Sequence, residues 1–208
     1  EADFDRGGRS VLGIRPLLWK NGWPVAGEVF KEGTYEIESE RRGYALELAV
    51  DFVRMEYTRH RFWEKDDTPV VPLKSQTLED VIGTWPQGKI NVRIGDYMFR
   101  PHQKWTITAV PDGGGYLGGP YYKIVIEGTN RALAATADAE VVTVPEFTGA
   151  PEQLWRIDQL TDGTYRIIPK EVPGTDKELV LVSVGDSTPS LGEFDMNSDN
   201  SKWNFRDH

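Results

Sequence analysis

The sequence predicts an all-β protein built from three repeated units. Three tryptophans each open a strand-like run and lie about 50 residues apart: Trp105, Trp155 and Trp203. A second series of Tyr-x-Ile openings has one interval about twice as long as the other: Tyr35, Tyr122 and Tyr165. Repeats of this length indicate one supersecondary unit used several times around a shared core. The doubled interval predicts a long insertion in the first unit.

The composition supports many short strands joined by turns. The chain has 208 residues, with 21 Gly, 13 Pro and 7 Trp, and no long apolar stripe of helical period. Its formal net charge is −9 and its basic residues do not cluster, which makes nucleic acid an unexpected partner. No apolar run is long enough to span a bilayer, and no signal peptide is visible. The absence of Cys excludes a disulfide framework and a cysteine-ligated metal site.

Each unit offers about four short strands separated by turn residues. Three such units predict a closed barrel with a hairpin cap, a β-trefoil, over residues 30–208. We expect Trp105, Trp155 and Trp203 to fill equivalent places in its core. The insertion in the first unit spans about residues 51–93 and contains a capping signal for one turn of helix at 75–80.

Residues 1–29 predict a hairpin with no sheet of its own. Two strand-like runs, 11–19 and 23–26, flank Asn21-Gly22, the strongest two-residue hairpin signal. Two strands alone are marginal in water, so we expect this hairpin to complete a sheet elsewhere. The alternative is that it packs on the repeat domain. Because the sequence starts at Glu1 and not at Met, we also expect a processed, truncated or cleaved product.

The Gln-x-Trp pattern, intact twice and present once as Ser-x-Trp, resembles the ricin-type β-trefoil lectin family over about residues 30–208. The resemblance implies a carboxylate that holds sugar hydroxyls on the strand after each opening. The matching places are Glu47, Ala134 and Leu181. Only the first unit keeps a carboxylate there, so the resemblance implies at most one usual site, with Glu47 and Gln103 as sugar-binding residues.

The run from Asp5 to Trp19, followed by Asn-Gly-Trp-Pro at 21–24, resembles the end of the five-bladed propeller of family 43 glycoside hydrolases, in particular arabinanase-type members. The resemblance places the hairpin in the last propeller blade. Those enzymes cleave glycosidic bonds with inversion and use three carboxylates on earlier blades. None of the three maps onto this chain, and neither does a metal-associated His. We therefore expect no catalytic residue and no cofactor here, and a metal ion only in the missing propeller.

Other motifs add no site. His60, His102 and His208 occur in unrelated contexts, which argues against a zinc site. The oxygen-rich stretch 195–200 lacks the Gly and the terminal Glu of an EF-hand loop, so it predicts a polar turn.

These observations predict the C-terminal, non-catalytic portion of a secreted or periplasmic glycoside hydrolase that acts on arabinan or a related arabinose-containing polysaccharide. We expect the trefoil to stabilise the propeller or to bind glycan, with the insertion, bearing Trp63 and Trp85, as its contact element. The expected partners are the polysaccharide and the propeller portion, either in the same chain or as a separately cleaved chain; nucleic acid and membrane are not expected. The alternatives are a free-standing carbohydrate-binding module and a purely structural trefoil.

Overall fold

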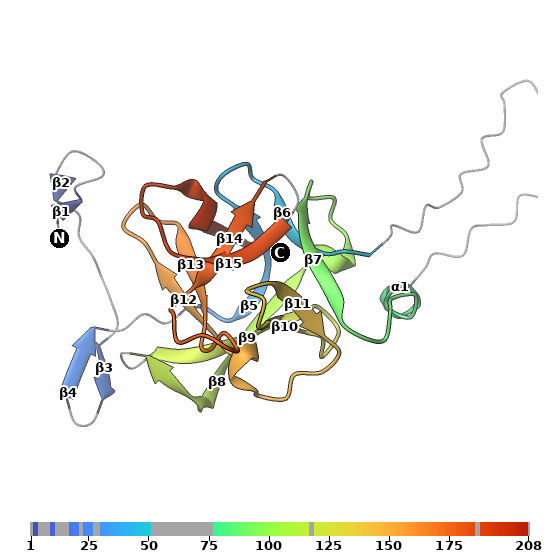
Figure 1. The fold of residues 1–208 in the computed structure, drawn as a ribbon, viewed down its shortest axis with the longest axis horizontal. Helices are drawn as coiled ribbons and strands as arrows, with labels where there is room; N and C mark the ends of the chain where they lie inside the picture. The colour runs from blue at the N-terminus through green and yellow to red at the C-terminus, as the bar shows by residue number, and fades with distance from the viewer. Residues whose placement is uncertain are drawn as a thin grey trace, which may run out of the picture.

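The computed structural model describes residues 2–3, 9–10, 17–20, 23–26, 30–50, 77–116, 119–185 and 188–207. Three units of four strands follow one another from residue 33 onward (Figure 1). The strands of unit 1 are β5 (Gly33–Ser39), β6 (Ala45–Leu48), β7 (Ile90–Gly95) and β8 (Trp105–Tyr116). Those of unit 2 are β9 (Gly119–Ile126), β10 (Ala132–Ala135), β11 (Val141–Val144) and β12 (Trp155–Gln159). Those of unit 3 are β13 (Tyr165–Pro169), β14 (Val180–Val184), β15 (Thr188–Gly192) and β16 (Trp203–Asp207).

The first and fourth strands of the units close a six-stranded antiparallel barrel. Strand pairing runs from β5 through β8, β9, β12, β13 and β16 and returns to β5. In every unit the repeating tyrosine is the cross-strand partner of the repeating tryptophan: Tyr35 with Trp105, Tyr122 with Trp155, and Tyr165 with Trp203. Both series therefore mark equivalent points, and the predicted all-β, β-trefoil fold is confirmed.

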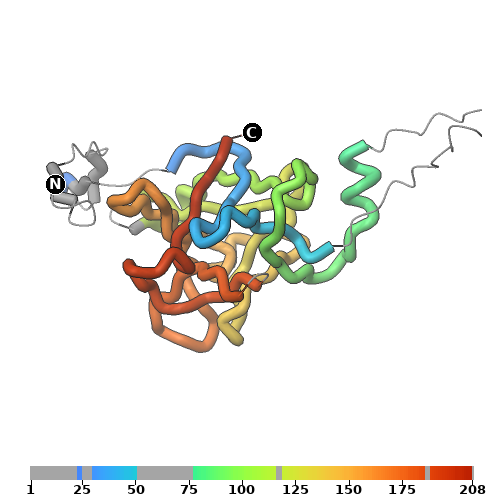
Figure 2. The backbone as a smooth tube through the Cα atoms, turned by 90° about the horizontal axis from the view of Figure 1, so that it is seen from above, coloured from blue at the N-terminus to red at the C-terminus, as the bar shows by residue number. Residues whose placement is uncertain are grey.

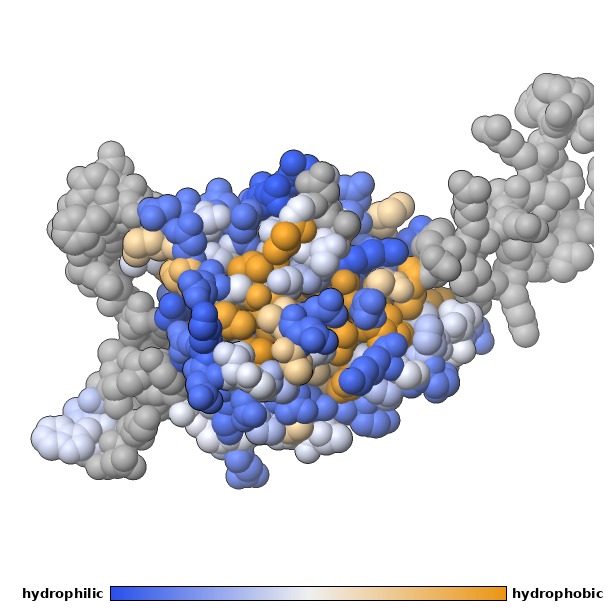
Figure 3. Space-filling view, in the orientation of Figure 1, coloured by the Kyte–Doolittle hydropathy of each residue, from blue (hydrophilic) through white to orange (hydrophobic). Residues whose placement is uncertain are grey.

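The second and third strands of each unit form the cap hairpins. These hairpins are β6–β7, β10–β11 and β14–β15. β7 also pairs with β11, and a bridge joins Glu140 to Ser190 of β15, so neighbouring hairpins support one another. Hydrophobic residues gather near the centre of this view and hydrophilic residues surround them (Figure 3).

The three repeating tryptophans lie in the core, as predicted. Each side chain is fully buried. Each indole N–H donates a hydrogen bond to a carbonyl on the second strand of its own unit: Trp105 to Leu46 (2.7 Å), Trp155 to Leu133 (3.0 Å) and Trp203 to Leu181 (2.8 Å). A 3-10 turn precedes each tryptophan: η2 (Pro101–Gln103), η3 (Pro151–Gln153) and η4 (Asp199–Ser201). Because the rings are buried with their only donor satisfied, they join the barrel to the cap.

Phe30 packs where the three units meet. Its ring centroid lies 5.2 Å from that of Tyr35, 6.1 Å from Tyr122 and 5.5 Å from Tyr165. Its backbone N–H also donates to Tyr122 Oη at 2.7 Å. One phenylalanine thus contacts the repeating tyrosine of every unit, which is consistent with a trefoil beginning at residue 30.

The segment between β6 and β7 covers residues 49–89, because β7 already begins at Ile90. The predicted helical turn is α1 (Leu78–Ile82), and Thr77 and Asp80 form its capping box. Figure 2 shows α1 at one edge of the domain. In the described part of the chain, no helix has the length and hydrophobicity needed to cross a membrane.

The N-terminal residues form separate two-stranded sheets. β1 (Ala2–Asp3) pairs with β2 (Arg9–Ser10), and β3 (Leu17–Lys20) pairs with β4 (Trp23–Ala26) as an antiparallel hairpin. Among the described residues, neither sheet shares a strand pairing with β5–β16. The rest of the expected first strand and the Asn-Gly turn, 11–16 and 21–22, lie outside the described residues. Membership of this hairpin in a propeller blade stays a prediction.

Candidate functional site

Glu47 is the centre of a buried hydrogen-bonded cluster in unit 1. Its carboxylate accepts from Arg93 Nε (2.5 Å), its cross-strand partner on β7, and from Gln103 Nε2 (2.6 Å). His102 Nε2 lies 3.5 Å from Glu47 Oε2. Burial alone would raise the pKa of Glu47, but the hydrogen bonds from His102, Arg93 and Gln103 together hold it below the usual value. The carboxylate is thus ionised and satisfied by protein donors.

Gln103 fastens the loop that precedes Trp105. Its Oε1 accepts from the backbone N–H groups of Met98 (2.8 Å) and Arg100 (3.3 Å). Its Nε2 donates to the carbonyl of Asp96 (2.8 Å) as well as to Glu47. The geometry therefore gives Glu47 and Gln103 a structural role, and sugar binding by this pair stays a prediction.

Unit 2 repeats this fastening and unit 3 does not. Gln153 Oε1 accepts from the N–H of Thr148 (2.7 Å), and its Nε2 donates to the carbonyl of Glu146 (3.5 Å). In unit 3 the shorter Ser201 donates from Oγ to the carbonyl of Asp195 (3.1 Å). The glutamine of Gln-x-Trp is thus a loop-holding residue wherever it occurs in this chain.

The register of the tryptophan hydrogen bonds corrects one predicted equivalence. Leu46, Leu133 and Leu181 accept the three indole N–H groups and are therefore equivalent. The residues that follow them are Glu47, Ala134 and Val182. The expected match of Leu181 to Glu47 is one residue off, and Val182 is the true counterpart. Unit 3 still has no carboxylate at this place.

The insertion was expected to contact sugar through Trp85 and Trp63, and the structure describes only Trp85. Trp85 is only 6 % exposed and belongs to the hydrophobic core. Arg131 holds the neighbouring backbone by donating to the carbonyls of Gly88 and Pro86, both at 2.7 Å. The structure therefore gives Trp85 a packing role in place of the expected sugar contact. Trp63 lies outside the described residues.

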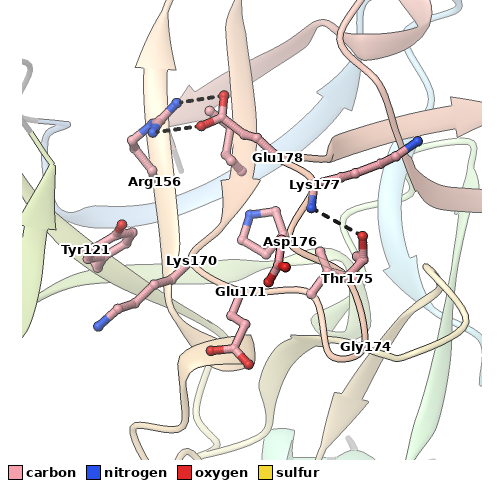
Figure 4. Close-up of a pocket in the computed structure, with 12 residues that line it drawn as sticks. Tyr121, Arg156, Lys170, Glu171, Gly174, Thr175, Asp176, Lys177 and Glu178 are labelled. Atoms are coloured by element: carbon pink, nitrogen blue, oxygen red, sulfur yellow. Dashed lines mark hydrogen bonds and ion pairs between the residues drawn. The ribbon is translucent and has the colours of Figure 1, made fainter.

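A polar pocket of about 590 Å³, which no sequence motif predicted, lies between units 2 and 3 (Figure 4). It is formed by β9, β12, β13 and the loop from β13 to β14. Its lining residues are Tyr121, Arg156, Ile168, Pro169, Lys170, Glu171, Val172, Gly174, Thr175, Asp176, Lys177 and Glu178. The only sequence signal for this pocket is the charged stretch 170–178, and a stretch of this composition is typical of an ordinary surface loop.

One wall of the pocket is a fixed guanidinium group. Arg156 is 7 % exposed, and its Nη1 and Nη2 each lie 3.4 Å from a carboxylate oxygen of Glu178 (Figure 4). Its Nε donates to Asp158 at 3.0 Å. This forked pairing joins the buried Arg156 to Glu178, whose side chain is 57 % exposed and lines the pocket.

Tyr121 supplies the aromatic ring of the lining, on the same side as Arg156 and across from the loop 174–177 (Figure 4). Lys170 Nζ lies 5.2 Å from the centroid of the Tyr121 ring and donates to the carbonyl of Gly113 at 2.6 Å. In the loop, Thr175 Oγ1 accepts from the N–H of Lys177, and Asp176 lies between them (Figure 4). The lining has three basic and three acidic side chains, so the pocket has no strong net charge. Such a lining suits a neutral, hydroxyl-rich ligand better than a polyanion.

Among the described residues, no group of three or more His, Cys, Asp or Glu side chains could hold a metal ion. Absence of a metal or cofactor from the whole chain stays a prediction.

Comparisons with known proteins agree with this fold. Residues 101–189 match a family model described as "Ricin-type beta-trefoil lectin domain-like". No curated protein sequence matches the chain. The designed 3-fold symmetric protein ThreeFoil is a structural neighbour with 19% sequence identity and a TM-score of 0.55, covering 85% of this chain and 99% of its own.

Two natural neighbours are longer proteins. An exo-beta-1,3-galactanase from Clostridium thermocellum has 15% identity and a TM-score of 0.52, covering 88% of this chain and 32% of its own. The Polyporus squamosus lectin, solved bound to a human-type influenza-binding epitope, has 16% identity and a TM-score of 0.52, covering 86% of this chain and 50% of its own. These likenesses concern the fold. With the closed barrel and the match of residues 101–189 to the family model, they show an all-β, ricin-like β-trefoil fold.

Proposed function

We propose that this chain is a carbohydrate-binding, non-catalytic portion of a glycoside hydrolase that acts on arabinan or a related arabinose-containing polysaccharide. The lectin-like family match supports a carbohydrate ligand, and the galactanase shows that a glycoside hydrolase can include this fold. The N-terminal resemblance supports an arabinanase-type parent, in which the hairpin 1–29 belongs to the last propeller blade. The parent is secreted or periplasmic, and its catalytic carboxylates lie in the propeller.

The observation on which glycan binding depends most is the pocket between units 2 and 3. Its volume of about 590 Å³ lies within the range of small-ligand sites and is enough for a short oligosaccharide. The exposed Glu178 carboxylate, paired with Arg156, supplies acceptors for sugar hydroxyls, and Lys177 lines the same pocket as a donor. Tyr121 adds a ring against which the C–H face of a sugar can pack.

The test is binding of soluble arabinan, galactan and xylan, measured by isothermal titration calorimetry with the full chain. We expect arabinan to bind most tightly and Tyr121→Ala to weaken it about tenfold, since one packed ring contributes about 1.4 kcal/mol. Phe147→Ala is the matched control, because Phe147 also lies beneath a lysine, Lys123, at 5.5 Å, but outside the pocket. Undiminished binding by Tyr121→Ala would remove the pocket as the site. Preference for galactan or xylan would overturn the arabinan assignment.

A purely structural trefoil is the second candidate. The observation in its favour is that Glu47 and Gln103 are bonded to protein groups, while Ala134 and Val182 offer no carboxylate in the other units. Failure of all three polysaccharides to bind would favour this candidate. A native mass spectrum distinguishes these two candidates from a free-standing carbohydrate-binding module. If the chain is part of the proposed hydrolase, the spectrum should show a propeller portion bound to the 23.5 kDa chain.

A further inference from the structure

The loop between β7 and η2 in unit 1 presents an aromatic pair, in which Phe99 is exposed and Tyr97 is half-buried. The rings of Tyr97 and Phe99 lie 4.7 Å apart between centroids, at an interplanar angle of 54°. Phe99 is 75 % exposed, and Met98 between them is 59 % exposed. Large apolar side chains at such exposure lower solubility and add little packing energy. We therefore look for a binding role, because stability does not explain them.

Phe99 also has an unfavourable backbone conformation. Its φ is +57°, in the left-handed region that bulky L-residues seldom adopt. In unit 2 the residue at the same distance before its glutamine is Gly149, with a φ of +80°. Unit 2 therefore makes the same turn with the residue best suited to it. Backbone strain that is kept at an exposed aromatic residue indicates a functional role for that residue.

The strained turn is held in place from below. Gln103 Oε1 accepts from the N–H groups on both sides of Phe99, those of Met98 and Arg100. Gln103 is itself 1 % exposed and bonded to Glu47. Because both flanks are fixed to one buried carboxamide, the backbone that carries the phenyl ring is held in one conformation, which lowers the entropy cost of binding.

We propose that Tyr97 and Phe99 form a second sugar-contact surface, separate from the pocket, on which the C–H face of one sugar ring of a neutral polysaccharide packs. The inference rests on the proposed carbohydrate-binding function. The patch of three side chains is far smaller than the roughly 1,200 Å² that a stable protein partner buries, which disfavours a protein occupant. Asp96, which directly precedes Tyr97, is exposed and can bond sugar hydroxyls.

The experiment titrates arabinan, and galactan for comparison, into the full chain and its Phe99→Gly variant. Glycine suits the left-handed turn, so the variant should keep the fold and show an equal or higher Tm. Loss of the ring should weaken polysaccharide binding about three- to tenfold. Phe99→Tyr keeps a ring and should bind as the wild type does, whereas Phe99→Asn, which tolerates this backbone region, should behave as Phe99→Gly. Met196→Ala, at 65 % exposure in unit 3, is the control for exposed apolar surface and should bind normally.

The outcomes separate the two claims. Normal polysaccharide binding by both Phe99→Gly and Phe99→Asn would overturn the second surface and leave the proposed function standing. Equal weakening by Met196→Ala would also overturn it, since the effect would then not depend on the aromatic pair. Absence of any binding by the wild type would overturn both. Combining Phe99→Gly with Tyr121→Ala should give the product of the two single effects, as independent surfaces require.

Discussion

Units 1 and 2 of the trefoil hold the loop before the repeating tryptophan with the same hydrogen bonds. The side chains that the two loops expose to solvent are different. Gln103 and Gln153 each accept from the loop N–H ahead of them and donate to a carbonyl two residues before it. The turn so held displays Phe99 in unit 1 and Gly149 in unit 2. The shared contacts thus build the fold, and the positions where the units differ are where binding should be sought.

A second difference lies on the first strand of each unit, at the position after the repeating tyrosine. The residues there are Glu36, Lys123 and Arg166. In units 2 and 3 the cation lies over the ring of a loop phenylalanine, Lys123 over Phe147 at 5.5 Å and Arg166 over Phe194 at 5.2 Å. Unit 1 has Tyr97 in the loop, and the nearby Glu36 carboxylate, after burial, helps to raise the pKa of this tyrosine. Unit 1 thus replaces a cation–π contact with a buried carboxyl group.

The largest expected effect tests what the units share. Trp155→Ala should lower the free energy of unfolding by about 3–5 kcal/mol, because a fully buried ring and its hydrogen bond are lost. Trp105→Ala and Trp203→Ala should cost about as much, measured by urea denaturation. Trp23→Ala is the control, since Trp23 is 76 % exposed, and should change little. If one of the three core variants lost less than about 1 kcal/mol, the units would not be equivalent.

The repeat could be predicted from sequence because it is a packing pattern. Trp105, Trp155 and Trp203 fill the core, and a core position accepts few residue types, so the periodicity stays legible. The misplaced match at Leu181 lies in unit 3, where ten residues (170–179) separate the first two strands, against five in unit 1 (40–44) and five in unit 2 (127–131). The spacing from the repeating tyrosine therefore does not carry over to this unit, and only the indole hydrogen bond identifies Val182 as the counterpart.

The pocket and the Phe99 surface could not be predicted from the sequence in this way. The pocket is assembled from two units, with Tyr121 and Arg156 distant in sequence from the loop 171–178. The strain at Phe99 depends on its φ, which is fixed by the tertiary contacts of Gln103 and leaves no pattern in the sequence. The sequence indicated Glu47 and Gln103 as sugar-binding residues, but it could not show that the two side chains are hydrogen-bonded to each other.

An intermediate effect sharpens the comparison of the two glutamines. Gln103→Ala should cost about 2–3 kcal/mol, because it removes the bonds to Met98, Arg100 and Asp96 and takes a donor from the buried Glu47 carboxylate. Gln153→Ala should cost about 1–2 kcal/mol, since no buried charge depends on it. Both values come from urea denaturation at neutral pH. Equal losses would mean that Glu47 gains nothing from Gln103.

The smallest expected effect concerns pH and the carboxyl group that only unit 1 has. Burial, reinforced by the neighbouring Glu38, raises the pKa of Glu36 to about 7. A carboxyl with a raised folded-state pKa binds more protons folded than unfolded, so stability should fall as pH rises from about 4.5 to about 7 and then level off. The charged groups near Glu36 are Glu38 and Arg206; Arg206 pairs with Glu38 at 2.7 Å and partly opposes the rise in the pKa of Glu36. Tyr97, whose own pKa is raised, is neutral in this pH range.

Glu36→Gln should therefore remove this decline and exceed the wild type in unfolding free energy by about 1–2 kcal/mol at pH 8. The measurement is urea denaturation at several values between pH 4.5 and 8. Lys123→Gln, the equivalent change in unit 2, should leave the slope unchanged because no carboxyl titrates there. Glu47 has the opposite sign: its lowered pKa contributes stability that is lost only as the pH falls through that pKa, below the window tested. Parallel curves for the wild type and Glu36→Gln would show that the carboxyl of unit 1 is not held protonated by its surroundings, and the two units would then differ in side chain but not in charge balance.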